Sequence, residues 1–152
     1  MKKSLISILT ASLLSVLSFA DDTGTVSQVT AKQGNLYKTT FTWTTGTNNN
    51  SVIAVSDSYI RGELLRVVFD PITSARPTNT YNIVLLDESG IDLLAGKGAS
   101  LATGTVTTVR PGIISTVSPI TNIAPFAVND RVTVSVTNGG NSISGKLVIY
   151  TR

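Results

Sequence analysis

Two short apolar runs in the middle of the chain constrain the fold more than any other feature. The first is LLRVVF at 64–69, and the second is YNIVLL at 81–86. Each run is rich in β-branched or aromatic residues and is bounded by Gly, Pro or Asp, which predicts strands buried on both sides. We therefore expect this pair of strands to form the centre of the fold, with the other strands packed around it.

The chain from Thr23 onward is typical of an all-β domain. Thr, Ser, Val, Gly and Asn dominate, apolar residues never recur at helical spacing, and turn residues appear at short intervals. The stiff side chains of Thr and Val suit a pleated surface. The expected architecture is an antiparallel β-sandwich or a barrel-like jelly roll, formed by a single domain over residues 21–152.

Two strands are predicted at the start of this domain, at 25–32 and 36–45, with a turn at Gly34-Asn35 between them. In the second strand the large aromatic side chains fall on one face. That face should lie in the core or against a partner, because large aromatic residues carry much of the burial in small domains. The residues concerned are Tyr37, Phe41 and Trp43.

The C-terminal part shows the clearest alternation. Val132, Val134 and Val136 alternate with polar residues, and the sequence NGGN at 138–141 then supplies residues that tolerate positive φ. A second alternating stretch, 143–152, follows. This pattern predicts a β-hairpin that reaches the last residue.

The first twenty residues, MKKSLISILTASLLSVLSFA, differ from the rest. Lys2 and Lys3 precede an apolar stretch over 5–19, and Ser18 and Ala20 are small residues at the positions that a signal peptidase reads. This pattern predicts a secretory signal that is cleaved after Ala20. The alternatives are a buried helix and an uncleaved anchor. The anchor is the only route by which this chain would contact a membrane, although a bilayer span usually needs about 20 apolar residues.

The composition removes most common catalytic arrangements. The chain has no Cys and no His, so disulfides, thiolate nucleophiles, Cys/His zinc sites and His-based acid–base catalysis are excluded. After Ala20 there is also no Gly-x-Ser-x-Gly elbow and no Ser-x-x-Lys pair that would activate a serine. We expect a protein that is not an enzyme, with no catalytic residues, no cofactor and no metal ligands.

The charge distribution does not indicate nucleic-acid binding. Lys2 and Lys3 are two of the 12 basic residues, while all 9 acidic residues follow Ala20, so the formal net charge falls from +3 for the chain to +1 for residues 21–152. The remaining basic residues are scattered and form no patch.

An acidic cluster surrounds Gly90 and consists of Asp87, Glu88 and Asp92. Closely spaced carboxylates can bind Ca²⁺, but the 12-residue ligand pattern of an EF-hand is absent. A glycosidase pair is also disfavoured, because neighbours on one turn cannot flank a glycosidic bond. The favoured interpretation is a solvated hairpin turn, which requires the same residue types.

Two further sequence features contain a basic residue: the Gly-Lys-Gly sequence at 96–98, and Arg66 in the first apolar run. Gly96-Lys97-Gly98 has part of a phosphate-loop pattern, but no helical pattern follows it, so a flexible loop is expected. Arg66 interrupts the first apolar run. It is expected to pair with Glu63 or Asp70, because an unpaired buried Arg is costly; the alternative is an outward-facing contact with another subunit.

Part of the chain resembles a group of small structural proteins of tailed bacteriophages. The resemblance lies in GELLRVVFDP at 62–71, PTNTYNIVLLDESGIDLLAG at 77–96 and the final strand GKLVIYTR at 145–152. It covers less than half of the chain. Phe69 and Ile72 depart from the small or polar residues of that group, and the signal-like segment is a larger departure, because virion proteins normally assemble in the cytoplasm.

The resemblance implies a virion-associated protein of the head or neck region, such as a decoration or head–tail component, that contacts copies of itself and other virion proteins. The low fraction of charged residues, 14%, and a positive mean hydropathy of +0.25 favour a surface buried by assembly. The alternative, favoured by the first twenty residues, is a domain exported to the periplasm or cell surface after cleavage at Ala20, for adhesion, glycan or protein binding, or filament assembly.

Overall fold

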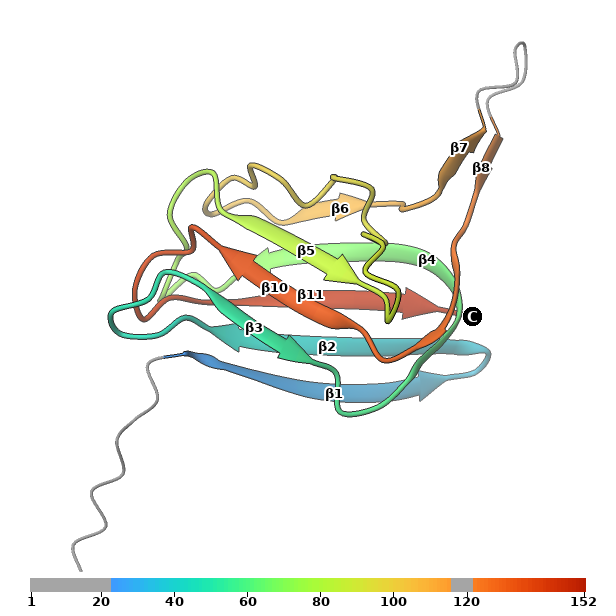
Figure 1. The fold of residues 1–152 in the computed structure, drawn as a ribbon, viewed down its shortest axis with the longest axis horizontal. Coiled ribbons are helices and arrows are strands. Elements are labelled where there is room, and N and C mark those ends of the chain that lie inside the picture. The colour runs from blue at the N-terminus through green and yellow to red at the C-terminus, as the bar shows by residue number, and fades with distance from the viewer. Residues whose placement is uncertain (1–22, 116–121) are drawn as a thin grey trace, which may run out of the picture.

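The computed structural model describes residues 23–115 and 122–152, so the signal-like segment at 1–20 lies outside the described residues. The described chain is all-β with antiparallel pairing, which confirms the predicted class (Figure 1). The strands are β1 (Thr25–Gln33), β2 (Leu36–Thr44), β3 (Val52–Val55), β4 (Ile60–Pro71), β5 (Asn82–Leu86), β6 (Thr107–Val109), β7 (Ile113–Ser115), β8 (Asn122–Ala124), β9 (Ala127–Asp130), β10 (Thr133–Thr137) and β11 (Ser144–Thr151).

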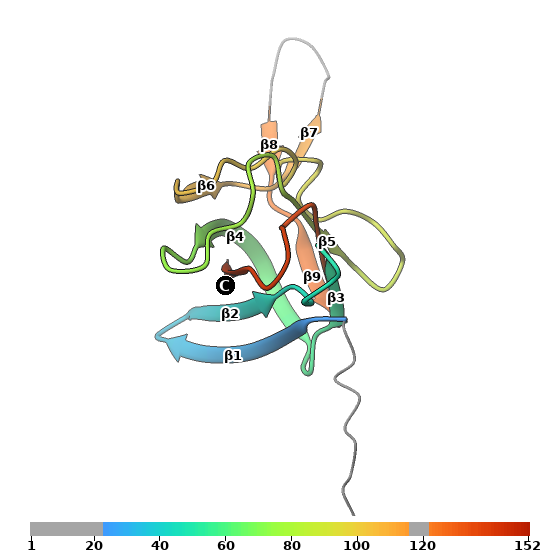
Figure 2. The ribbon, with the colours of Figure 1, turned by 90° about the vertical axis from the view of Figure 1, so that its left-hand side faces the viewer.

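The strands form two facing layers and one separate hairpin. The larger sheet has the order β1-β2-β11-β4-β6, and β9 pairs with the first residues of β4. The smaller sheet has the order β3-β10-β5. Figure 2 shows the two layers side by side, with the β7–β8 pair extending away from them.

The core lies between the layers, because β2, β4, β5 and β10 each bury residues on one of their two faces. Phe41 and Trp43 of β2 are buried, as predicted, and so are Val134 and Val136 of β10. Tyr37 is the exception: it shares the face of Phe41 and Trp43 but is exposed. It lies beyond the part of the larger sheet that the second layer covers.

The prediction that the two central apolar runs form a pair buried on both sides is wrong. Their strands lie in different sheets: β4 pairs with β11, and β5 pairs with β10. Burial alternates along both, so that Val67 and Phe69 are buried while Val68 is partly exposed. The outward residues of each run are aliphatic, which conceals the alternation in the sequence.

The predicted C-terminal hairpin is also wrong. Its two strands exist, but β10 lies in the smaller sheet, whereas β11 lies between β2 and β4 in the larger one. The connection at 138–143 bonds to the loop after β2 instead of closing on itself. The Thr45 hydroxyl donates to the carbonyl oxygen of Gly140 and accepts from the amide of Ile143, and the Gly139 amide donates to the carbonyl of Asn50. These bonds carry the chain from one layer to the other.

The strand β4 bends at Gly62, where its pairing partner changes. The four residues 60–63 pair with β9, and the residues from Leu64 to Pro71 pair with β11. Gly62 has φ of 103°, and a Cβ there would overlap the carbonyl oxygen of Arg152. Glu63 and Arg152 exchange backbone hydrogen bonds, and their side chains form an ion pair of 2.7 Å. The last residue is thus fixed to the bend.

The buried Tyr81 predicts a loss of stability at alkaline pH. Burial, assisted by the Asp70 carboxylate, raises the pKa of Tyr81 to about 12, against about 10 in an unfolded chain. The un-ionised Tyr81 therefore contributes to the stability of the folded state. This stabilisation is complete below pH 10 and is lost as the pH rises through 12, because between these values Tyr81 ionises readily only in the unfolded state. We expect a fall of up to about 2–3 kcal/mol in the free energy of unfolding.

Urea unfolding at a series of pH values between 8 and 12 measures this loss. A Tyr81→Phe variant is the matched control, since it keeps the ring and removes the ionising group. If the variant and the parent chain lose the same free energy above pH 10, the fall comes from other groups and the expectation for Tyr81 is wrong.

Candidate interaction surface and cleft

One lateral side of the molecule is closed by a segment that runs along β5. We call residues 91–101 the capping segment. Three backbone hydrogen bonds join this segment to β5 and to Tyr81, the residue before β5. The amides of Leu93 and Leu101 donate to the carbonyls of Leu85 and Tyr81, respectively. The amide of Ile83 donates to the carbonyl of Gly98. The free edge of β5 is therefore occupied within the molecule, which protects it from pairing with another chain.

The acidic cluster holds the turn that leads into the capping segment. The Asp87 carboxylate accepts hydrogen bonds from the amides of Ser89 and Ile91, at 2.9 and 2.8 Å, and a carboxylate oxygen of Glu88 accepts from the amide of Arg131 at 3.3 Å. The predicted turn is confirmed. Across residues 23–115 and 122–152, no group of three or more Asp or Glu side chains is arranged to hold a metal ion.

Asp92 and the Gly96-Lys97-Gly98 sequence serve the same segment. The two carboxylate oxygens of Asp92 accept from the amides of Leu94 and Gly96. Gly98 is buried so close to β5 that a Cβ would overlap the carbonyl oxygen of Ile83. This sequence lies in a loop, as predicted, and no helix follows it in residues 99–115. The backbone of the loop is held by the bonds to Asp92.

On the opposite lateral side, no described residue covers the two outer strands in this way. Among residues 23–115 and 122–152, β1 pairs only with β2, and β3 pairs only with β10. β1 is nine residues long, lacks proline and carries one charged residue, Lys32, so it has few of the devices that protect sheet edges. Three aliphatic side chains stand exposed on these strands: Val29 at 67%, Ile53 at 68% and Val55 at 55%. We call the β1 and β3 edges, with these side chains, the open edge.

The hairpin geometry indicates which backbone groups of β1 are free. Gly34 has φ of 61° at the first position of a two-residue turn, and Gln33 faces Leu36. In such hairpins the pair next to the turn exchanges both backbone hydrogen bonds, and bonded pairs then alternate along the ladder. The amides and carbonyls of Gln28 and Thr30 therefore point away from β2, toward the open edge.

The outer face of the smaller sheet continues the open edge with uncharged residues. Ile53, Ser135 and Val84 lie in one row across the three strands, and Val55, Thr133 and Leu86 lie in the next. No ionisable side chain belongs to either row. A partner that docks here would not have to desolvate a charge.

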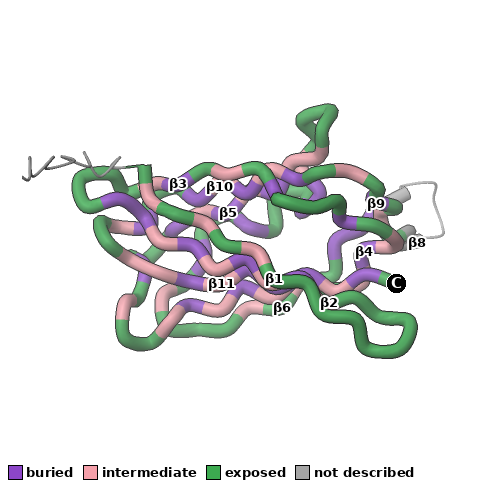
Figure 3. Tube along the Cα trace, turned by 90° about the horizontal axis from the view of Figure 1, so that it is seen from below, coloured by how far each residue is buried: buried purple, intermediate pink, exposed green. Residues whose placement is uncertain are grey.

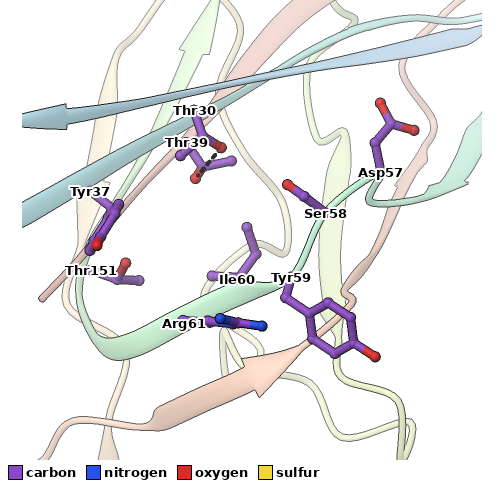
Figure 4. Close-up of a pocket in the computed structure, with 9 residues that line it drawn as sticks. All are labelled: Thr30, Tyr37, Thr39, Asp57, Ser58, Tyr59, Ile60, Arg61 and Thr151. Atoms are coloured by element: carbon purple, nitrogen blue, oxygen red, sulfur yellow. Dashed lines mark hydrogen bonds between the residues drawn. The ribbon is translucent and has the colours of Figure 1, made fainter.

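A cleft with a volume of about 540 Å³ lies beside the open edge (Figure 4). Its walls come from Thr30 of β1, Tyr37 and Thr39 of β2, Thr151 of β11, and the segment 57–61, which ends with the first two residues of β4. The cleft arises because β1 and β2 extend beyond the short β3, which leaves the inner face of their hairpin end without a second layer. Figure 3 shows this hairpin end as an exposed extension of the larger sheet.

One wall of the cleft is anchored by Gln28. Its side-chain carbonyl accepts from the amide of Asp57 at 2.8 Å, and its amide group donates to the Ser58 hydroxyl at 2.8 Å. Ser56 is buried and ties the same segment to β10, because its hydroxyl donates to the carbonyl of Ser58 and accepts from the amide of Val132. Side-chain bonds therefore fix the backbone of this wall before any ligand arrives.

The expected ion pair of Arg66 is wrong. Arg66 points outward from β4 and lies over the ring of Tyr150 on β11, with its guanidinium carbon 4.0 Å from the ring centroid. These residues face each other across the two strands. Because Arg66 is on the solvent side of the sheet, water and the aromatic face satisfy its charge without a carboxylate.

The sequence interpretation identified the aromatic residue Tyr37 as a core or partner contact, but it missed the cleft. Tyr59, Arg61 and Asp57 cluster within five positions after a short strand, and this was the available signal. Their meeting with Thr30 and Thr151 depends on long-range pairing, which spacing along the chain does not show.

No family model, curated protein or solved structure matches this chain. Among the residues that the structure describes, no helix has the length and apolar character needed to cross a bilayer.

Proposed function

We propose that this chain is a non-enzymatic structural protein of a phage particle, in the form of a two-layer β-sandwich that joins neighbouring subunits through its open edge. The observation that carries the proposal is the difference between the two lateral sides. The β5 side is closed by backbone hydrogen bonds from the capping segment, while the β1 and β3 side exposes strand edges beside Val29 and Ile53. Unprotected strand edges are sites where chains pair with one another.

The sequence supports the same proposal independently. The chain has few charges and positive mean hydropathy, and its central and final stretches resemble small structural proteins of tailed bacteriophages. The β4 and β11 strands that carry much of this resemblance lie side by side in the larger sheet. They provide the scaffold, and the open edge provides the contact.

The purified chain is expected to form oligomers that a lysine on the open edge disrupts. Val29→Lys and Ile53→Lys each place a charge on an exposed aliphatic position, so they should shift the chain to a monomer while the fold remains intact. Size-exclusion chromatography with light scattering measures the shift. Ile91→Lys is the matched control, because Ile91 is similarly exposed, at 55%, but lies on the closed side.

A parent chain that is strictly monomeric over the accessible concentration range would overturn assembly through the open edge. A loss of oligomers in Ile91→Lys equal to that in Val29→Lys would also count against it. Mass spectrometry of purified phage particles tests the wider proposal, since a virion protein must be present there in a fixed ratio to the major capsid protein.

The second candidate is an exported domain for surface adhesion, glycan or protein binding, or filament assembly. The basic and apolar pattern of residues 1–20 favours it specifically. The N-terminal mass of the protein from its native cells distinguishes the two functions. A chain that begins at Asp21 supports export, and a chain that begins at Met1 or Lys2 supports assembly in the cytoplasm.

A further inference from the structure

We propose that the cleft beside the open edge binds a neutral sugar unit of a glycan. This inference goes beyond the assembly role and does not depend on it, because it uses the inner face of the β1–β2 hairpin end and the segment 57–61. Clefts that take small ligands usually have volumes of about 300–1000 Å³ and combine apolar surface with a few placed polar groups. The cleft lies within this range, at about 540 Å³.

The lining combines the two kinds of surface that a pyranose ring presents. A sugar ring has apolar C–H faces and a rim of hydroxyl groups that both donate and accept hydrogen bonds. Tyr37 and Tyr59 supply aromatic surface at two sides of the cleft, and Thr30, Thr39, Ser58 and Thr151 supply hydroxyl groups (Figure 4). Tyrosine suits such a site, because it offers a flat apolar ring together with a polar end.

The charges in the cleft favour a neutral ligand. The lining holds one carboxylate, from Asp57, and one guanidinium, from Arg61. An acidic sugar or a phosphate would meet Asp57 as a like charge, and a cationic ligand would meet Arg61. A neutral sugar can instead accept hydrogen bonds from one group and donate to the other.

These polar groups are available, because the protein itself does not use them fully. The Arg61 guanidinium lies 5.6 Å from the ring centroid of Tyr59 and pairs with no carboxylate in the described part of the chain. The Ser58 hydroxyl accepts from Gln28, which leaves its own hydrogen to donate. The Thr30 and Thr39 hydroxyls share one bond of 3.0 Å, and Thr30 also accepts a bond of 3.5 Å from the side-chain amide of Gln28. Both hydroxyls keep further capacity.

The geometry favours a sugar over an extended peptide in this cleft. A peptide that adds to a sheet needs a row of free backbone groups, and those of β1 point to the open edge. The cleft is instead lined by side chains from β1, β2, β11 and the segment 57–61. The bonds of Gln28 to Asp57 and Ser58 hold one wall in place, which lowers the ordering cost of binding.

Saturation-transfer NMR with the full chain and four disaccharides, maltose, cellobiose, lactose and chitobiose, tests the proposal. At least one disaccharide is expected to receive magnetisation, with a dissociation constant of about 1 mM or lower. Tyr59→Ala should weaken that binding about tenfold or more, and Asp57→Asn should weaken it while preserving the shape of the cleft. Gln28→Ala should weaken it less, because it frees the wall without removing a ligand contact.

The matched control is Tyr150→Ala. Tyr150 also offers a partly exposed ring, but its side chain points to the outer face of β11, opposite to Thr151. Its loss should leave sugar binding unchanged, and circular dichroism checks that every variant is folded. The proposal is overturned if none of the four disaccharides binds, if Tyr59→Ala and Asp57→Asn leave binding unchanged, or if a second copy of the chain protects the cleft residues instead.

Discussion

Replacement of Trp43 by alanine is expected to lower the free energy of unfolding by about 3–5 kcal/mol. Trp43 is 1% exposed, lies 6.0 Å from the ring of Tyr81 between ring centroids, and covers the backbone at Gly145. An alanine would leave a cavity between the two layers that rigid strands cannot close. Trp43 is the only tryptophan of the sequence, so the variant has no tryptophan fluorescence to follow. Urea unfolding is therefore measured by circular dichroism.

Trp43→Phe separates the packing of the Trp43 ring from the effect of its unpaired N–H group. The indole N–H of Trp43 is buried and has no hydrogen-bond partner in the described part of the chain, a situation that costs about 1–3 kcal/mol. Phenylalanine keeps much of the packing and removes the unpaired donor, so its cost should be well below that of alanine. Equal losses for the two variants would mean that packing against Tyr81 and Gly145 is not what makes Trp43 important.

Replacement of Gly62, at the bend of β4, by alanine should strongly destabilise the fold. Gly62 has φ of 103°, which L-residues rarely adopt, and the added Cβ would overlap the backbone carbonyl of Arg152. The conformational cost is about 1–3 kcal/mol, and the overlap adds about 1–3 kcal/mol, because the neighbouring atom is backbone and cannot rotate away. Thermal and urea unfolding measure the sum.

Gly90→Ala provides the matched control for this effect. Gly90 also has a positive φ, 80°, but a Cβ there would meet nothing within 4 Å. It should therefore show the conformational cost alone. If both alanine variants lose the same stability, the contact between Gly62 and the C-terminal residue does not matter, and the bend is held by other bonds.

These two predictions concern the scaffold on which both proposed surfaces depend. The bend at Gly62 places the start of β4, and with it Tyr59 and Arg61, against the end of β11. Because β11 is bonded on both sides, by β2 and by β4, a change at the bend is expected to disturb the cleft as well as stability. The open edge at β3 is separated from the bend and should be affected less.

Local patterns in the sequence were sufficient to predict the class of the fold and several elements. The Thr- and Val-rich composition indicated an all-β chain, the turn at Gly34-Asn35 was placed correctly, and so was the acidic turn at 87–90. Such features depend on residues that are close in sequence, on backbone preferences and on short-range hydrogen bonds, so they can be read without knowledge of the partners.

The partners of each strand were decided only in the tertiary structure. Val132–Val136 and 143–152 have the pattern of a hairpin, yet β10 and β11 belong to different layers, because Thr45 and Asn50 bind the loop between them. The capping segment, the open edge and the cleft follow from the same long-range choices. Periodicity shows which face of a strand is apolar, but it does not show which strand lies beside it, because that depends on free energy gained between residues far apart in the chain.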